Sequence, residues 1–160
     1  MIRTNMIGQI NGSRVAARLM TDRDAGKIIN ILGGGSDGEY FPGMGVYGAT
    51  KRGLDYFTDA LAKELATTGI LVAKVRPGLV VTDAVIREAR DNPDMFESSR
   101  PMMNNIVDQV ETVAPWIADQ VLALDKTGKK IRWLTGSKIG WRMLAARFRR
   151  REDQFARFGL

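Results

Sequence analysis

Few residues of this chain could carry out proton chemistry at neutral pH, because the sequence contains neither histidine nor cysteine. Ser-His-Asp hydrolysis, thiolate catalysis and the usual zinc sites are therefore excluded, and we expect no metal. Tyr47 and Lys51 stand four residues apart in a segment with helical periodicity, so their side chains share one helix face. A neighbouring ammonium favours a phenolate and lowers the ordinary tyrosine pKa of about 10. The pair is therefore either a tyrosine that acts as an acid or base or an ordinary surface tyrosine beside a lysine, and its context must decide between them.

The elements that must position this pair are a strand, a glycine-rich loop and a long helix. The apolar run at 28–32 is rich in β-branched residues and predicts a strand buried on both faces. Gly33, Gly34 and Gly35 follow at once, and they allow the backbone either to approach another group closely or to adopt a positive φ. Helical periodicity then runs from Met44 to about Thr68, and a second strand is expected at 70–75.

Two motifs in this order resemble those of the short-chain dehydrogenase/reductases. Tyr47-Gly-Ala-Thr-Lys51 follows the strand and glycine/serine loop, and Arg76-Pro-Gly-Leu-Val-Val-Thr82 follows the second strand. A bare YxxxK is a weak signal, but both strands, the helix and the second motif in the right order make the match strong. It covers the chain from about Asn5 to Thr135. The resemblance implies an α/β fold, namely the second half of a Rossmann-like, doubly wound parallel sheet with flanking helices.

The resemblance also implies roles for individual residues. Tyr47 would be the catalytic acid or base, and Lys51 would lower its pKa and hold the ribose. Ser36 would position the substrate oxygen, although the family has its serine directly after the strand, where residues 32–34 are Leu-Gly-Gly. Loop glycines could return Ser36 to the same point; the alternative is a site without a serine. Asn5 would order a relay water, or it could be only a helix cap.

The same resemblance implies NAD or NADP as the cofactor and a small carbonyl or alcohol as the substrate. The cofactor would be bound by Tyr47, Lys51, Pro77, Gly78, Val80 and Thr82. For Thr82 the alternative is that its hydroxyl acts only as a helix N-cap.

The remainder of the chain predicts a substrate lid, one further helix, one further strand and a tail. Residues 83–108 read as a short charged helix followed by a long loop, which would form the lid. A helix is expected at 112–124 and a strand at 130–135. We therefore expect residues 1–137 to form the Rossmann-like part. Residues 138–160 would form a basic tail, helical at 140–158, that is solvated, packs on a partner subunit or lies on an anionic membrane surface.

The net charge of +6 does not predict a nucleic-acid partner. From Lys138 to the end there are seven Lys or Arg and two acidic residues, a balance of +5, so the preceding part carries only +1. The sequence has no run of about 18 uncharged apolar residues and no signal peptide, so we expect a soluble cytoplasmic protein.

The glycine fingerprint that holds a dinucleotide pyrophosphate belongs to the first half of a Rossmann fold, and the sequence before Asn5 lacks it. The GGGSDG segment at 33–38 has the wrong spacing and leads toward the tyrosine helix. The chain thus looks like the C-terminal part of a reductase, with an unpaired outer edge on its first strand. We expect it to be inactive alone and to form a dimer or tetramer at full length. The alternative is a non-catalytic fragment that binds a partner through its basic tail and its dimer helices, among them the helix from Met44 to Thr68, which in the family packs against a second subunit.

Overall fold

The computed structural model describes residues 1–149 and 151–160. The chain divides into two compact units, each with its own core. The first unit comprises 1–76 and 118–131, and the second comprises 77–117 and 132–160.

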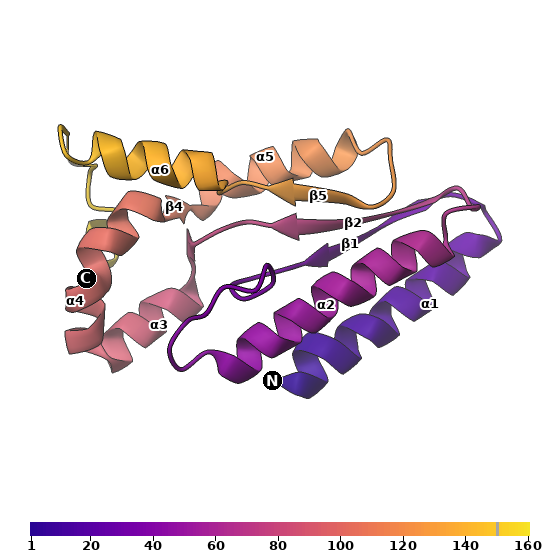
Figure 1. The fold of residues 1–160 in the computed structure, drawn as a ribbon, viewed down its shortest axis with the longest axis horizontal. Helices are drawn as coiled ribbons and strands as arrows, with labels where there is room; N and C mark the ends of the chain where they lie inside the picture. The colour runs from indigo at the N-terminus through magenta and orange to yellow at the C-terminus, as the bar shows by residue number, and fades with distance from the viewer. Residues whose placement is uncertain (150) are drawn as a thin grey trace. The chain divides into compact units, whose positions relative to one another are not determined.

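The first unit is a three-stranded sheet with helices against it. The strand order is β1-β2-β5, with strands β1 (Gly26–Ile31), β2 (Ile70–Arg76) and β5 (Lys129–Arg132). Strands β1 and β2 are parallel with Gly26 opposite Ile70, and the three arrows run in the same direction in Figure 1. The helices of this unit are the π-helical segment η1 (Arg3–Gly8), α1 (Gln9–Thr21) and α2 (Gly45–Glu64). This arrangement confirms the predicted α/β fold with a parallel sheet.

The core of the first unit lies between the strands and α2. Ile28, Ile70 and Val72 from the strands pack with Leu61 and Ala62 of α2. Removing such apolar surface from water is the main favourable contribution to folding.

A buried polar chain also connects α1, β1 and α2. Ser13 Oγ donates to Asn30 Oδ1 at 3.3 Å, and Asn30 Nδ2 donates to Thr58 Oγ1 at 3.0 Å. All three residues are buried, so their hydrogen bonds avoid the cost of leaving polar groups unpaired away from water.

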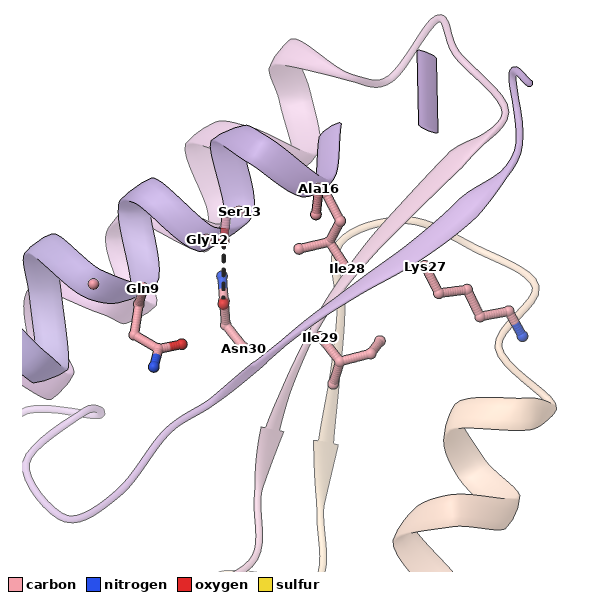
Figure 2. A pocket seen from close by; sticks show the side chains of 9 residues that line it. Gln9, Gly12, Ser13, Ala16, Lys27, Ile28, Ile29 and Asn30 are labelled. Atoms are coloured by element: carbon pink, nitrogen blue, oxygen red, sulfur yellow. Dashed lines mark hydrogen bonds between the residues drawn. The ribbon is translucent and has the colours of Figure 1, made fainter. Parts of the chain in front are cut away.

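Among the described residues, β1 is an edge strand with β2 on one side only, as the sequence predicted. Beside it lies a groove of about 340 Å³ between α1 and β1. Figure 2 shows Ser13 and Asn30 facing each other there, while the side chain of Lys27 points away, toward the carbonyls of Val121 and Leu122 that it binds. The prediction of burial on both faces was wrong at Ile31, which is 47% exposed.

The second unit contains a two-stranded parallel sheet and several helices around a separate core. Val80 pairs with Asp108 and Val81 with Gln109. The core consists of Val81, Ile86, Ala89, Phe96, Val107 and Phe155. The elements are β3 (Val80–Val81), α3 (Asp83–Asp91), α4 (Pro93–Ile106), β4 (Asp108–Gln109), α6 (Gly136–Ala145), η2 (Ala156–Phe158) and the first part of α5 (Val110–Leu122), whose end belongs to the first unit.

The long loop predicted after α3 is a second helix, α4. Asn92-Pro93 was interpreted as loop, but proline suits the first turn of a helix, where its missing N–H has no intrahelical partner. Pro101 lies inside the same helix, where proline normally disfavours helical structure. Phe96, buried in the core of the unit, shows that tertiary packing outweighs local propensity here.

The prediction of one continuous helix at 140–158 was wrong, because α6 ends at Ala145 and among the described residues only the short 3₁₀ helix η2 follows; Arg150 lies outside the described residues. Phe155 is completely buried and meets Phe96 edge to face, with ring centroids 5.0 Å apart. Arg151 donates from Nη1 to the carbonyls of Asn104, Asn105 and Val107. These contacts need a non-helical course, so the tail is part of the core of the second unit. In the part of the chain that the structure describes, no helix is long and apolar enough to cross a membrane.

Candidate active site

The hydroxyl of Tyr47, in the first turn of α2, lies against the backbone of Gly33. A Cβ built on Gly33 would lie 2.1 Å from Tyr47 Oη and 3.0 Å from Cζ, where no real Cβ could stand. Gly33 is not among the residues with positive φ, so glycine is required here for space rather than for backbone conformation. The glycine loop and the tyrosine helix therefore meet at the hydroxyl.

A second close approach lies two residues further along the loop. A Cβ on Gly35, which has a φ of +84°, would lie 2.6 Å from the Cα of Gly48 in α2. Both roles that the sequence predicted for these glycines, close approach and positive φ, are confirmed. The group that they approach is the start of α2.

Lys51 lies one turn after Tyr47 and reaches the end of β1. Its Nζ donates to the carbonyl of Ile31 at 3.0 Å and lies 5.7 Å from the centroid of the Tyr47 ring. An ammonium has three N–H donors, so two remain beyond the bond to Ile31. The predicted shared face of Tyr47 and Lys51 is present.

The pKa directions differ from the sequence expectation. Burial raises the pKa of the Tyr47 phenol above 10.0, and burial lowers the pKa of Lys51 below 10.5. The sequence predicted that the ammonium would lower the tyrosine pKa. Burial of the Tyr47 hydroxyl is the cause of the raised pKa, and the Lys51 ammonium lies 5.7 Å from the ring centroid. Tyr47 is consequently a neutral phenol at pH 7.

Asn5 lies within the π-helical segment η1, a type of helix often found at functional sites. Its Nδ2 donates to Thr50 Oγ1 at 3.4 Å, and Thr50 Oγ1 donates to the carbonyl of Tyr47 at 2.7 Å. The cap position of η1 is Ile2, so Asn5 does not cap this helix. Asn5 is thereby connected, through Thr50, to the backbone of the candidate catalytic residue.

The Met6 side chain of η1 lies against Gly53 of α2, a glycine that the sequence did not single out. A Cβ on Gly53 would lie 2.7 Å from Cε of Met6, beside Asn5. Thr50 was also missed, although a polar residue on the buried face of a helix was the available signal.

Ser36 is completely buried, and its Oγ has no hydrogen-bond partner in the described part of the chain. Its amide donates to the carbonyl of Gly33 at 3.2 Å, and its own carbonyl accepts from Arg52 Nη1 at 3.0 Å. The residue that the structure places against the Tyr47 hydroxyl is Gly33. The catalytic role of Ser36 stays a prediction.

The candidate nicotinamide-side residues Pro77, Gly78, Val80 and Thr82 lie in the second unit. Gly78 has a φ of +82°, and a Cβ there would lie 2.6 Å from Cβ of Leu134. Val80 belongs to β3. Thr82 occupies the N-cap position of α3 but makes no side-chain cap bond, and it is exposed. Its hydroxyl is therefore not used by the helix.

Comparison with known proteins supports the geometric argument. The sequence model described as short chain dehydrogenase matches residues 1–93, more than half of the chain. The chain belongs to the short-chain dehydrogenase family. The matched residues of the chain include Gly33, Tyr47, Lys51 and Thr82.

Curated relatives match most of the chain. It is 32% identical over 145 residues to chlorophyll(ide) b reductase NOL, chloroplastic, of Arabidopsis thaliana, covering 86% of this chain and 40% of that protein. It is 31% identical over 121 residues to acetoacetyl-CoA reductase of Cupriavidus necator, covering 74% of this chain and 48% of that protein. The chain thus spans less than half the length of these relatives.

Solved structures of the family show the same fold. A serine dehydrogenase complexed with NADP⁺ in its closed form has a TM-score of 0.69 at 26% identity, covering 86% of this chain and 55% of that one. An actinorhodin polyketide ketoreductase with NADPH also has a TM-score of 0.69 at 26% identity, with coverages of 82% and 55%.

Proposed function

We propose that a protein containing this chain is an NAD(P)-dependent oxidoreductase that transfers hydride between a nicotinamide and a carbonyl or alcohol. The observation that carries the proposal is the Tyr47 hydroxyl and the Lys51 ammonium on one face of α2, at the end of β1. Membership of the short-chain dehydrogenase family, relatives named reductases and solved neighbours complexed with NADP⁺ or NADPH support it.

The donor groups of the site fit such a cofactor. Lys51 keeps two N–H donors for ribose hydroxyls, while its bond to Ile31 fixes the ammonium in place. The resemblance to the family assigns the nicotinamide carboxamide to the Val80 backbone and the exposed Thr82 hydroxyl of the second unit. A bound nicotinamide would supply or accept the hydride.

The proton chemistry belongs to Tyr47. In carbonyl reduction, the Tyr47 O–H bond breaks and its proton forms a new O–H bond on the substrate oxygen. The phenol is protonated at pH 7 and so carries the proton to be donated, but burial raises its pKa and makes it a weaker acid, which a bound cationic nicotinamide would offset. Alcohol oxidation needs the phenolate and should therefore be favoured at higher pH. Asn5, connected to Tyr47 through Thr50, would order the water that reprotonates the site.

Replacing Ser36 with alanine should test the serine role. If Ser36 polarises the substrate carbonyl, its loss should lower turnover by about 100-fold, near 3 kcal/mol, with little change in cofactor affinity. Ser98→Ala, at an exposed serine that bonds only to the Met95 carbonyl, is the control for serine removal. Steady-state rates of an active protein that contains this chain decide the point. An unchanged rate would show that the site works without a serine.

The proposed function is tested further by dinucleotide affinity. The sequence has no glycine fingerprint ahead of a helix N-terminus to hold the pyrophosphate. Calorimetric titration of the 160-residue chain with NADPH and NADH should therefore show binding no tighter than about millimolar, near −4 kcal/mol. A longer polypeptide that carries the glycine-rich half ahead of residue 1 should bind micromolar NADPH or NADH and turn over a carbonyl substrate.

Micromolar binding by the 160-residue chain would contradict this expectation. If the longer polypeptide showed neither binding nor turnover, the second candidate would be favoured, a partner-binding module. Exposed apolar side chains on η1 (Ile7) and α1 (Val15 and Leu19) would supply a surface for a partner or a second copy in a dimer or tetramer.

A further inference from the structure

Seven charged side chains form a continuous chain of ion pairs in the first unit. They come from the glycine loop, from α2 and from strands β2 and β5. In order of contact they are Glu39, Arg76, Asp37, Lys130, Asp55, Lys74 and Asp59.

The middle of this series of ion pairs is shielded from water and its ends are more exposed. The side chains of Lys74, Asp55 and Lys130 are 6%, 13% and 17% exposed, whereas that of Asp59 is 49% exposed. Burial alone would raise the pKa of Asp55, but hydrogen bonds and charges from Lys130 and Lys74 lower it below 3.8. Ion pairs shielded from solvent are stronger than exposed ones, so the central pairs are the ones able to set geometry.

One cation of the ion-pair series, Lys130, joins two different parts of the site. Lys130 Nζ, on β5, contacts a carboxylate oxygen of Asp37 and lies 2.8 Å from Asp55 Oδ1. Asp37 belongs to the glycine turn, four residues after Gly33. Asp55 belongs to α2 and lies two helical turns after Tyr47, on the same face.

The glycine turn needs such an anchor. Its internal bonds run from Ser36 N to Gly33 O and from Gly38 N to Gly35 O, so two overlapping turns connect Gly33 to the segment that carries Asp37. Four of the six residues at 33–38 are glycine, which has the largest backbone entropy and no side chain to pack. The Asp37 carboxylate joins this turn to the cations of two strands.

We propose that Lys130 is a positioning residue for the reaction proposed above. By bridging Asp37 and Asp55, it holds the glycine turn and the tyrosine helix in the register that seats the Tyr47 hydroxyl against Gly33. The inference rests on the proposed function for its catalytic consequence, but the positioning itself is a property of this chain.

The test is a matched pair of variants, Lys130→Met and Lys74→Met. Lys130→Met breaks the bridge but leaves Asp37 with Arg76 and Asp55 with Lys74. Lys74→Met removes a more buried cation that contacts only α2, and leaves Asp55 with Lys130. Neither variant leaves a shielded carboxylate without a cation. An unpaired buried charge of that kind would be strongly destabilising.

The primary readout is the nuclear Overhauser effect between the Gly33 α protons and the Tyr47 ring protons in the 160-residue chain. The sequence has only three tyrosines, and Tyr40 and Tyr56 are 83% and 77% exposed, so they serve as internal references. We expect the contact to be lost and the Tyr47 ring shifts to change in Lys130→Met. Both should be retained in Lys74→Met, and Lys130→Arg should restore both.

A second variant breaks the same bridge from its other end. Asp37→Asn leaves Lys130 with Asp55 and Arg76 with Glu39, and it should also lose the Gly33–Tyr47 contact. It decides the matter if Lys130→Met does not fold. In an active protein containing this chain, Lys130→Met should lower kcat by about 10- to 100-fold with KM nearly unchanged, as expected for misplaced reacting groups.

The inference is overturned if a folded Lys130→Met or Asp37→Asn chain keeps the Gly33–Tyr47 contact with the ring shifts of Lys74→Met. Failure of the proposed function would appear differently, as unchanged turnover when the Tyr47 hydroxyl is removed. The two outcomes are therefore separable.

Discussion

Replacing Tyr47 with phenylalanine should lower the turnover of an active protein containing this chain by at least about 100-fold, while the cofactor still binds. The substitution removes only the hydroxyl oxygen and its proton. Lys51 keeps its bond to Ile31, so the ribose-binding ammonium stays in place. Rates of NADPH oxidation, with a separate calorimetric measurement of cofactor affinity, check the prediction.

Tyr56→Phe is the matched control, because Tyr56 lies on the same helix and is exposed. This variant loses the same hydroxyl group at a position away from Gly33, so the protein should keep its turnover rate. Near-normal turnover in Tyr47→Phe would end the assignment of Tyr47 as the proton donor.

Gly33→Ala should displace the Tyr47 hydroxyl and lower turnover by about 10- to 100-fold, because a misplacement of about 1 Å is enough for a loss of this size. The added Cβ would stand 2.1 Å from Tyr47 Oη, so the ring must turn away from the loop. Burial is the cause of the raised pKa of Tyr47, so a ring turned toward water should have a pKa nearer 10.0. The pKa of Tyr47 should therefore fall in Gly33→Ala. Turnover and a pH titration of the tyrosine ring signals by NMR measure the two effects.

Gly45→Ala provides the control for this change. Gly45 begins α2, does not have a positive φ, and has open space where a Cβ would stand. It should keep both its rate and the tyrosine pKa. If Gly33→Ala behaved like Gly45→Ala, the contact between Gly33 and the hydroxyl would have no catalytic importance.

Local patterns were enough to locate the central elements. The predicted strands at 28–32 and 70–75 and the helix at 44–68 correspond to β1, β2 and α2, with differences of a few residues at the ends. Four-residue spacing alone placed Tyr47 and Lys51 on one face, because helical geometry does not depend on distant contacts. The run of glycines similarly predicted a close approach, although not the group approached.

Patterns misled where distant residues decide the conformation. The tail at 140–158 has helical periodicity, but Phe155 gains more by entering the core beside Phe96 than by continuing a helix. Asn92-Pro93 indicates a loop by its sequence, but Pro93 begins α4, and Phe96 of that helix is buried. In both places burial of a large aromatic side chain outweighs propensities that are worth only about 1 kcal/mol or less for most residues.

By itself, the sequence predicted the reacting groups: without histidine or cysteine, proton transfer is left to Tyr, Lys, Asp or Glu, and the family resemblance pointed to Tyr47 and Lys51. Only the tertiary structure decided what surrounds them. It placed Gly33 against the hydroxyl, Ile31 on the ammonium and Lys130 between the loop and the helix. These contacts join residues up to 93 positions apart, and the direction of the Tyr47 pKa follows from burial. Neither property can be read from local spacing, because both depend on which distant segments the fold packs together.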